Sequence, residues 1–161
     1  MKTPLIALAS ALLMTAVPAT SQDIIVSAEE AAAVELISRE LDRNLVHADW
    51  PRQQARGEGV AMVRFQRDAD GRAVDVEFYR RSGSSSVDRL ARRAVKRLGR
   101  NAPLPALGGA DQIFQANIIV ANSEQAFSNF ASKLAKLEKT RLSDPRERRV
   151  FAFTASPRKA S

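Results

Sequence analysis

Basic residues recur between positions 87 and 100, and they are the first side chains in this sequence that could bind a ligand. Apolar residues at Val87, Leu90, Ala94 and Leu98 have the spacing of one helix face, which places the basic residues on the opposite face. Cationic groups gathered on one face attract anions, although such a face is more often only solvated. The candidate anionic-surface residues are Arg89, Arg92, Arg93, Lys96, Arg97 and Arg100.

Residues suited to catalysis or metal binding are sparse. The chain has no Cys, so a thiol nucleophile, a disulfide and a Cys-ligated metal are excluded, and its single His, His47, argues against a zinc site. Serines at 82–86 supply hydroxyl groups, but no Gly-x-Ser-x-Gly elbow surrounds them. Asp68, Asp70 and Asp75 lack the spacing of a calcium loop, and a turn explains them. The sequence therefore predicts a non-enzyme with no metal and no cofactor.

The first residues indicate export. Lys2 precedes an uncharged apolar run over residues 5–17, and Val17-Pro18-Ala19 offers the small residues that a signal peptidase recognises. We expect residues 1–19 to be a cleaved signal peptide; an uncleaved anchor is the alternative, but the run is short for a bilayer and Pro18 interrupts it. The predicted location is the periplasm, with no transmembrane span in the mature chain. Export argues against nucleic acid as the partner of a chain with net charge +7.

The elements that position these residues follow from periodicity. A helix is predicted within residues 22–49, with Ser27 as its cap. Alternating strands at 60–66 and 73–79 flank an Asp-Gly turn at 68–71, which predicts an antiparallel hairpin. Ser85, with Asp88 three residues later, is the predicted cap of the basic helix. A loop marked by prolines then leads to a third strand at 113–120.

The chain continues past this third strand. Ser123 is the predicted cap of a further amphipathic helix, residues 150–154 are a short strand candidate, and residues 156–161 are expected to be disordered. The predicted fold is α+β: a three-stranded antiparallel sheet (hairpin, helix, strand) packed on amphipathic helices, with an extra C-terminal helix. The predicted division is 1–19 signal peptide, 22–49 N-terminal helix, 50–122 central domain, 123–155 extra helix and strand, and 156–161 tail.

The central region resembles the C-terminal domain of TonB-type energy transducers. The shared features, in order, are an aromatic-Pro pair, a first strand with Gly, Val and Phe, an Asp-Gly-Arg hairpin, a Ser-Gly join to an Ala-containing helix, and prolines before a final apolar strand. In this chain they are Trp50-Pro51, Gly59-x-x-x-Val63-x-Phe65, Asp70-Gly71-Arg72-Ala73-Val74-Asp75-Val76, Ser82-Gly83 with Asp88, Ala91 and Ala94, and Pro103 with Pro105.

The resemblance implies a mode of action, in which an exposed edge of the last strand captures an extended segment of an outer-membrane receptor by strand addition. Under this interpretation the peptide-binding residues are Gln112, Ile113, Phe114, Gln115, Ala116, Asn117, Ile118, Ile119 and Val120, together with Trp50 and Pro51. The family's energy transducers also have a membrane anchor and a Pro-rich spacer. This sequence shows neither. The resemblance therefore predicts a binding role but not energy transduction.

Three functions remain open from the sequence. The first is a soluble periplasmic module that binds a peptide segment or partner protein by strand addition, with a link to outer-membrane receptor transport. The second is a structural envelope protein that self-associates as a homodimer through the extra helix or final strand. The third is polyanion binding through the basic helix face.

Overall fold

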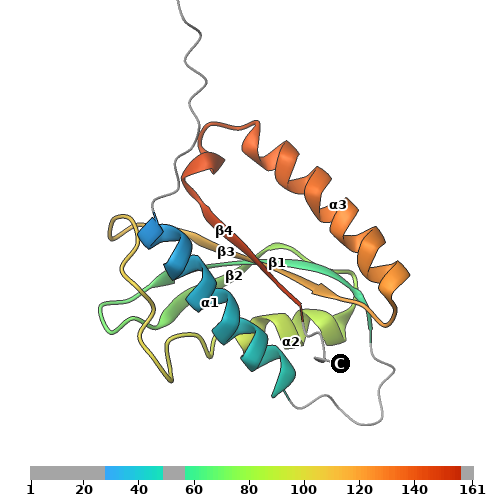
Figure 1. The fold of residues 1–161 in the computed structure, drawn as a ribbon, viewed down its shortest axis with the longest axis horizontal. Helices are drawn as coiled ribbons and strands as arrows, with labels where there is room; N and C mark the ends of the chain where they lie inside the picture. The colour runs from blue at the N-terminus through green and yellow to red at the C-terminus, as the bar shows by residue number, and fades with distance from the viewer. Residues whose placement is uncertain (1–27, 49–56, 157–161) are drawn as a thin grey trace, which may run out of the picture.

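The computed structural model describes residues 28–48 and 57–156 (Figure 1). Three α-helices, a 3₁₀ helix and four strands alternate along this part of the chain. In order they are α1 (Ala28–Val46), β1 (Gly59–Arg67), β2 (Ala73–Arg80), α2 (Ser85–Val95), β3 (Phe114–Val120), α3 (Glu124–Leu142), η1 (Glu147–Arg149) and β4 (Phe151–Ala155). The predicted signal peptide, Ser27 and Trp50-Pro51 lie outside the described residues.

The sheet has four strands in the order β2-β1-β3-β4. The predicted β1–β2 hairpin is confirmed, and β3 pairs antiparallel with the other side of β1. The prediction of three antiparallel strands is incomplete, because β4 joins β3 in the parallel direction and makes the sheet mixed. Parallel neighbours need a crossover between them, and α3 provides it.

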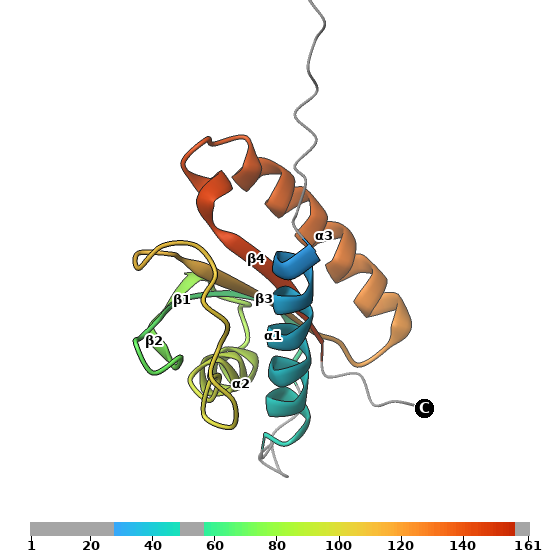
Figure 2. The same cartoon turned by 60° about the vertical axis from the view of Figure 1, so that its left-hand side comes forward.

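Helices α1 and α2 cover one face of the sheet and form the main core (Figures 1 and 2). The stripe predicted for α2 is buried here, as are the inward-facing residues of β1 and β3. Aromatic rings mark the centre, with Phe65 stacked on Phe114 at 5.3 Å between centroids. Burying rings of this size contributes about 2 kcal/mol each, so this face supplies most of the hydrophobic stabilisation.

Helix α3 covers the opposite face of the sheet (Figure 2). Its cap is as predicted, because the Ser123 Oγ accepts a hydrogen bond from the Ala126 amide at 3.1 Å. A second, smaller apolar cluster lies beneath it, formed by Val60, Met62, Ile119 and Leu134. Strand β1 is therefore buried on both faces over most of its length.

The turns depend on two glycines with positive φ. Gly71 (φ 79°) closes the predicted hairpin turn. The Gly71 amide donates a hydrogen bond to the Asp68 carbonyl at 3.1 Å. Gly99 (φ 79°) ends the turn after α2, where a Cβ would come within 2.1 Å of the Gly71 carbonyl oxygen. The end of α2 therefore packs directly against the hairpin turn, and only glycine permits this approach.

The cap of α2 differs by one residue from the prediction. Ser84, not Ser85, is the N-cap, and its side chain makes no capping hydrogen bond. Asp88 instead accepts hydrogen bonds from the amide and the hydroxyl of Ser82, at 2.8 and 2.7 Å. Asp88 therefore still stabilises the start of α2, because its carboxylate accepts hydrogen bonds from donors that precede the helix.

Candidate functional site

The predicted docking strand, β3, is paired on both sides. Its antiparallel partner is β1, from Gly59 opposite Val120 to Phe65 opposite Phe114. Its other edge carries β4, in parallel register from Phe114 opposite Phe151 to Ile118 opposite Ala155. This corrects the expectation of an exposed edge on the last strand: β3 is interior, and the chain's own C-terminal strand occupies the place assigned to a receptor segment.

Side chains anchor β4 to the sheet. Phe153 is buried and meets Phe65 edge-on, with 6.2 Å between ring centroids. Phe151 is half-buried and stacks on Phe114 at 6.1 Å. Phe153 and Ala155 belong to the main core, so β4 is bound by apolar burial as well as by the hydrogen bonds of the ladder.

Polar contacts fix both ends of β4. At its start, the Gln112 side chain donates to the Arg149 carbonyl at 2.7 Å and the Phe151 amide donates to the Ile113 carbonyl at 3.0 Å. At its end, the Ser156 amide donates to Asp42 Oδ1 on α1 at 3.0 Å. Burial raises the pKa of Asp42, and this hydrogen bond partly offsets the rise by favouring the charged form.

The second edge of the sheet is β2, which pairs only with β1 within the described residues. Two register shifts interrupt this pairing, one between Met62 and Val63 and one between Arg64 and Gln66. At the second shift Asp75 has φ 51°, an uncommon value for a residue with a side chain. Bulges and charged side chains are the usual means by which edge strands resist pairing with another chain.

A polar network joins α3 to the sheet. Gln115 and Asn117 of β3 are buried and hydrogen-bonded to each other at 3.0 Å, and Gln115 also donates to Glu138 at 2.9 Å. Arg141, whose side chain is 3% exposed, donates to Glu138 from Nε and Nη2 at 3.0 and 2.7 Å.

Arg64 completes this network. It forms an ion pair with Glu147 of η1, donates a hydrogen bond to Gln115 at 3.0 Å and lies over the Tyr79 ring at 3.7 Å from its centroid. Gln115 and Asn117 were predicted to bind a peptide, whereas their side chains bind each other and α3. Polar residues two apart in an otherwise apolar strand were the available signal that this face is covered.

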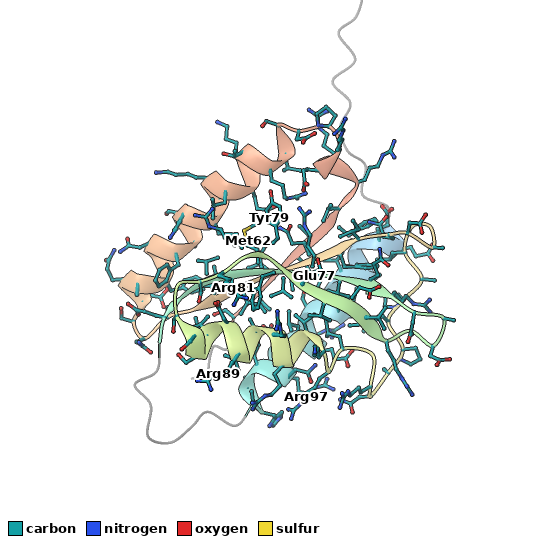
Figure 3. The ribbon with its side chains drawn as sticks, turned by 180° about the vertical axis from the view of Figure 1, so that it is seen from behind. Met62, Glu77, Tyr79, Arg81, Arg89 and Arg97 are labelled. Atoms are coloured by element: carbon teal, nitrogen blue, oxygen red, sulfur yellow. The ribbon has the colours of Figure 1, made fainter. Side chains whose placement is uncertain are left out.

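The predicted basic face is present on α2 and the turn after it. All of its members are exposed except Arg97, which is half-buried. Figure 3 shows Arg89 of α2, and Arg97 in the turn after it, on the side turned away from the sheet. The guanidinium of Arg92 lies over the Phe78 ring at 4.9 Å, so this residue is partly fixed by β2. The structure does not bring the basic face next to the β3 edge, and the two candidate sites are separate.

Within residues 28–48 and 57–156, no three His, Cys, Asp or Glu side chains gather where they could hold a metal ion. None of the helices described is long and apolar enough to cross a bilayer. His47 is exposed at the end of α1.

A family model described as the TonB C terminal matches residues 37–120, just over half of the chain. The chain belongs to the TonB C-terminal family. The match begins inside α1 and ends at the last residue of β3, so the TonB C-terminal region comprises the second half of α1, the hairpin, α2 and β3. Comparison with curated proteins and with solved structures found no match.

The TonB C-terminal assignment indicates an envelope-associated domain that interacts with a protein partner. Residues 123–156, here called the C-terminal extension, lie beyond the match and contain α3, η1 and β4. This extension covers both the second sheet face and the edge of β3. The edge of β3 that was predicted to accept a partner segment is therefore paired with the chain's own β4.

Proposed function

We propose that the protein is a periplasmic binding module, without catalytic activity, that holds an extended segment of a partner protein by strand addition at β3. In the bound state the partner segment takes the place of β4. One observation carries the proposal: β4 is itself an extended segment, and it pairs in parallel register with five residues of the β3 edge that was predicted from the sequence to accept a partner segment. The predicted signal peptide supports the periplasmic location.

The β3 edge is favoured over the β2 edge on physical grounds. Strand addition needs a straight row of backbone donors and acceptors. The row on β2 is interrupted at two register shifts, whereas β3 pairs with both neighbours without a shift. A partner segment on β3 therefore forms an unbroken ladder.

β4 is suited to exchange because of its length and its position. It is a five-residue strand and the final element of the described chain, so it can leave without unpairing β1, β2 or β3. Its departure exposes Phe153, which costs about 2 kcal/mol unless the incoming segment supplies an equivalent group. We therefore expect the partner segment to carry an aromatic or large aliphatic residue at the Phe153 position.

A covalently attached strand competes strongly with a free one. Short connections give effective concentrations of about the millimolar range, so a partner must be locally abundant or make further contacts. Segments of outer-membrane receptors are the candidate partners. Binding of such a segment would link the protein to receptor transport.

The test is a reversible lock on β4. Asn117 and Thr154 are register partners on β3 and β4, and the chain has no Cys, so the double variant Asn117→Cys/Thr154→Cys has one possible disulfide. The probe is a synthetic peptide copying residues 150–156, and its binding is followed by amide shifts of residues 114–120. We expect binding when the disulfide is reduced and no binding when it is oxidised.

The reduced and oxidised forms both carry the two substitutions and differ only in the disulfide, so each form is the control for the other. A peptide carrying Phe153→Ser should bind at least about tenfold more weakly, because it lacks the buried ring. Binding that is equal in both redox forms, or absent in the reduced form, would rule out exchange at β3. Receptor segments are then compared with the copied peptide in the same assay.

A further inference from the structure

A groove separate from the β3 edge lies where the end of β2 approaches α2. Its lining includes the Phe78 ring and three arginines, Arg81, Arg89 and Arg92, with Gly83 at one side. Its volume is about 510 Å³, which suits a few side chains of a ligand. Figure 3 shows Arg81 near the sheet and Arg89 on α2. The sequence analysis included Arg89 and Arg92 in a helix face but did not associate them with Arg81 or Phe78.

Phe78 holds two of these guanidinium groups in place. The central carbons of Arg81 and Arg92 lie 4.7 and 4.9 Å from the centre of the ring. A guanidinium stacked on an aromatic ring keeps its in-plane N–H donors available at its edges. The stacking also removes side-chain freedom before a ligand arrives, which lowers the entropic cost of binding.

The groove carries excess positive charge. Asp88 is its one acidic member, and its Oδ1 already accepts hydrogen bonds from the Ser82 amide and hydroxyl. Its other oxygen is 3.6 Å from Arg81, whose side chain remains 66% exposed. One carboxylate cannot neutralise both Arg81 and Arg92, and the stacked pair is therefore complementary to an added anion.

We propose that this groove binds an acidic segment of a protein partner through bidentate carboxylate contacts with Arg81 and Arg92. Fixed, planar donors match Asp and Glu carboxylates, whereas adsorption to an anionic lipid surface requires only net charge. Space around Gly83, where a Cβ would meet no atom within 4 Å, lets a peptide backbone approach. This inference does not depend on exchange of β4, because the groove shares no residue with the β3 edge.

The test compares two pairs of substitutions with equal charge loss in the full chain. Arg81→Gln/Arg92→Gln removes the stacked pair, and Arg93→Gln/Arg100→Gln removes two exposed charges outside the groove. The probe is a fluorescent eight-residue peptide with alternating Glu residues, and its Gln counterpart is the ligand control. We expect the first pair to weaken Kd at least about tenfold, from the loss of charge-assisted hydrogen bonds, and the second at most about threefold.

Two further measurements distinguish a stacked arginine pair from diffuse charge and from a lipid-binding surface. Phe78→Leu keeps an apolar side chain but removes the stacking, and it should weaken peptide binding several-fold while the melting temperature confirms folding. Equal losses in the two double variants would overturn the proposal, because the effect would then be diffuse charge. Tighter binding to phosphatidylglycerol vesicles than to the peptide, affected equally by both pairs, would also overturn it and identify a lipid surface.

Discussion

Arg141 is the buried charged residue that joins α3 to η1. Its side chain is almost fully buried and lies between Glu138 on its own helix and Glu147 of η1. Burying a guanidinium costs several kcal/mol, and paired carboxylates repay this only when the geometry is complete. The network is therefore sensitive to removal of a single member.

Arg141→Ala should lower the free energy of unfolding by about 3 kcal/mol, because Glu138 and Glu147 would remain partly buried with fewer donors. Chemical denaturation measures the change. Lys139→Ala on the exposed side of α3 is the control and should change it by less than about 0.5 kcal/mol. Similar values for the two variants would mean that the network contributes no net stability.

Glu40 on α1 makes stability depend on pH. Burial raises its pKa above the ordinary value of 4.5, while the hydrogen bond from the Gly99 amide and the nearby charge of Arg43 oppose the rise. The folded protein thus holds this proton more tightly than the unfolded chain does. The resulting stabilisation is present below about pH 4.5 and is lost as the pH rises through the raised pKa.

Glu40→Gln removes this titration and keeps an oxygen that can accept from Gly99. The stability of the variant relative to the natural chain should therefore improve between about pH 4 and pH 7. Denaturation at the two pH values gives the comparison, and Glu35→Gln on the exposed face of α1 controls for general charge effects. A relative stability that falls over this range would contradict the assignment.

Gly99 couples two elements, the turn after α2 and the hairpin turn. Its φ is positive, and a Cβ at this position would collide with the backbone of Gly71 and Arg72. The Ala73 amide also donates to the Leu98 carbonyl at 3.2 Å, so β2 begins against this turn. The position of α2 on the sheet thus depends on a contact between backbones.

Gly99→Ala should destabilise the fold by about 2 to 5 kcal/mol, which combines the backbone penalty with overpacking. Gly83→Ala is a matched control, since Gly83 also has positive φ (92°) but has open space where a Cβ would lie. The control should cost about 1 kcal/mol. Equal losses, measured by thermal or chemical denaturation, would show that the close approach is unimportant.

The molecule as a whole combines a TonB C-terminal region with an extension that covers it. Strands β1 and β3 are central, whereas β4 is a short terminal strand at the margin of the sheet. The free energy needed to open an element at the margin of a fold is smaller than the free energy of global unfolding. The exchange proposed for β4 requires such partial opening.

Hydrogen exchange should therefore show lower protection for β4 amides than for those of β1 and β3 that pair with each other, by at least about tenfold in rate. The measurement is made on the unmodified chain at low denaturant concentration. Oxidation of the Asn117→Cys/Thr154→Cys lock should raise β4 protection to the level of its neighbours. Equal protection of β1, β3 and β4 in the unlocked chain would show that β4 opens only with the whole fold.

Self-association is the other property of the whole molecule that can be tested. The apolar residues of α3 and β4 pack on the chain's own sheet, so neither needs a second copy to be buried. Sedimentation should accordingly show one species whose mass does not change with concentration. A dimer that dissociates on dilution would favour the structural, self-associating role instead.

Local patterns in the sequence determined most of the elements and the family. Alternation defined the hairpin and β3, three-four spacing defined α2 and α3, and turn chemistry defined Gly71, because each depends on neighbours within a few residues. The parallel placement of β4, the burial of Gln115 and Asn117, and the meeting of Phe78 with Arg81 and Arg92 came only from the tertiary structure. These features depend on how separate elements pack together, and a strand's own periodicity does not specify which strand will pair with its edge.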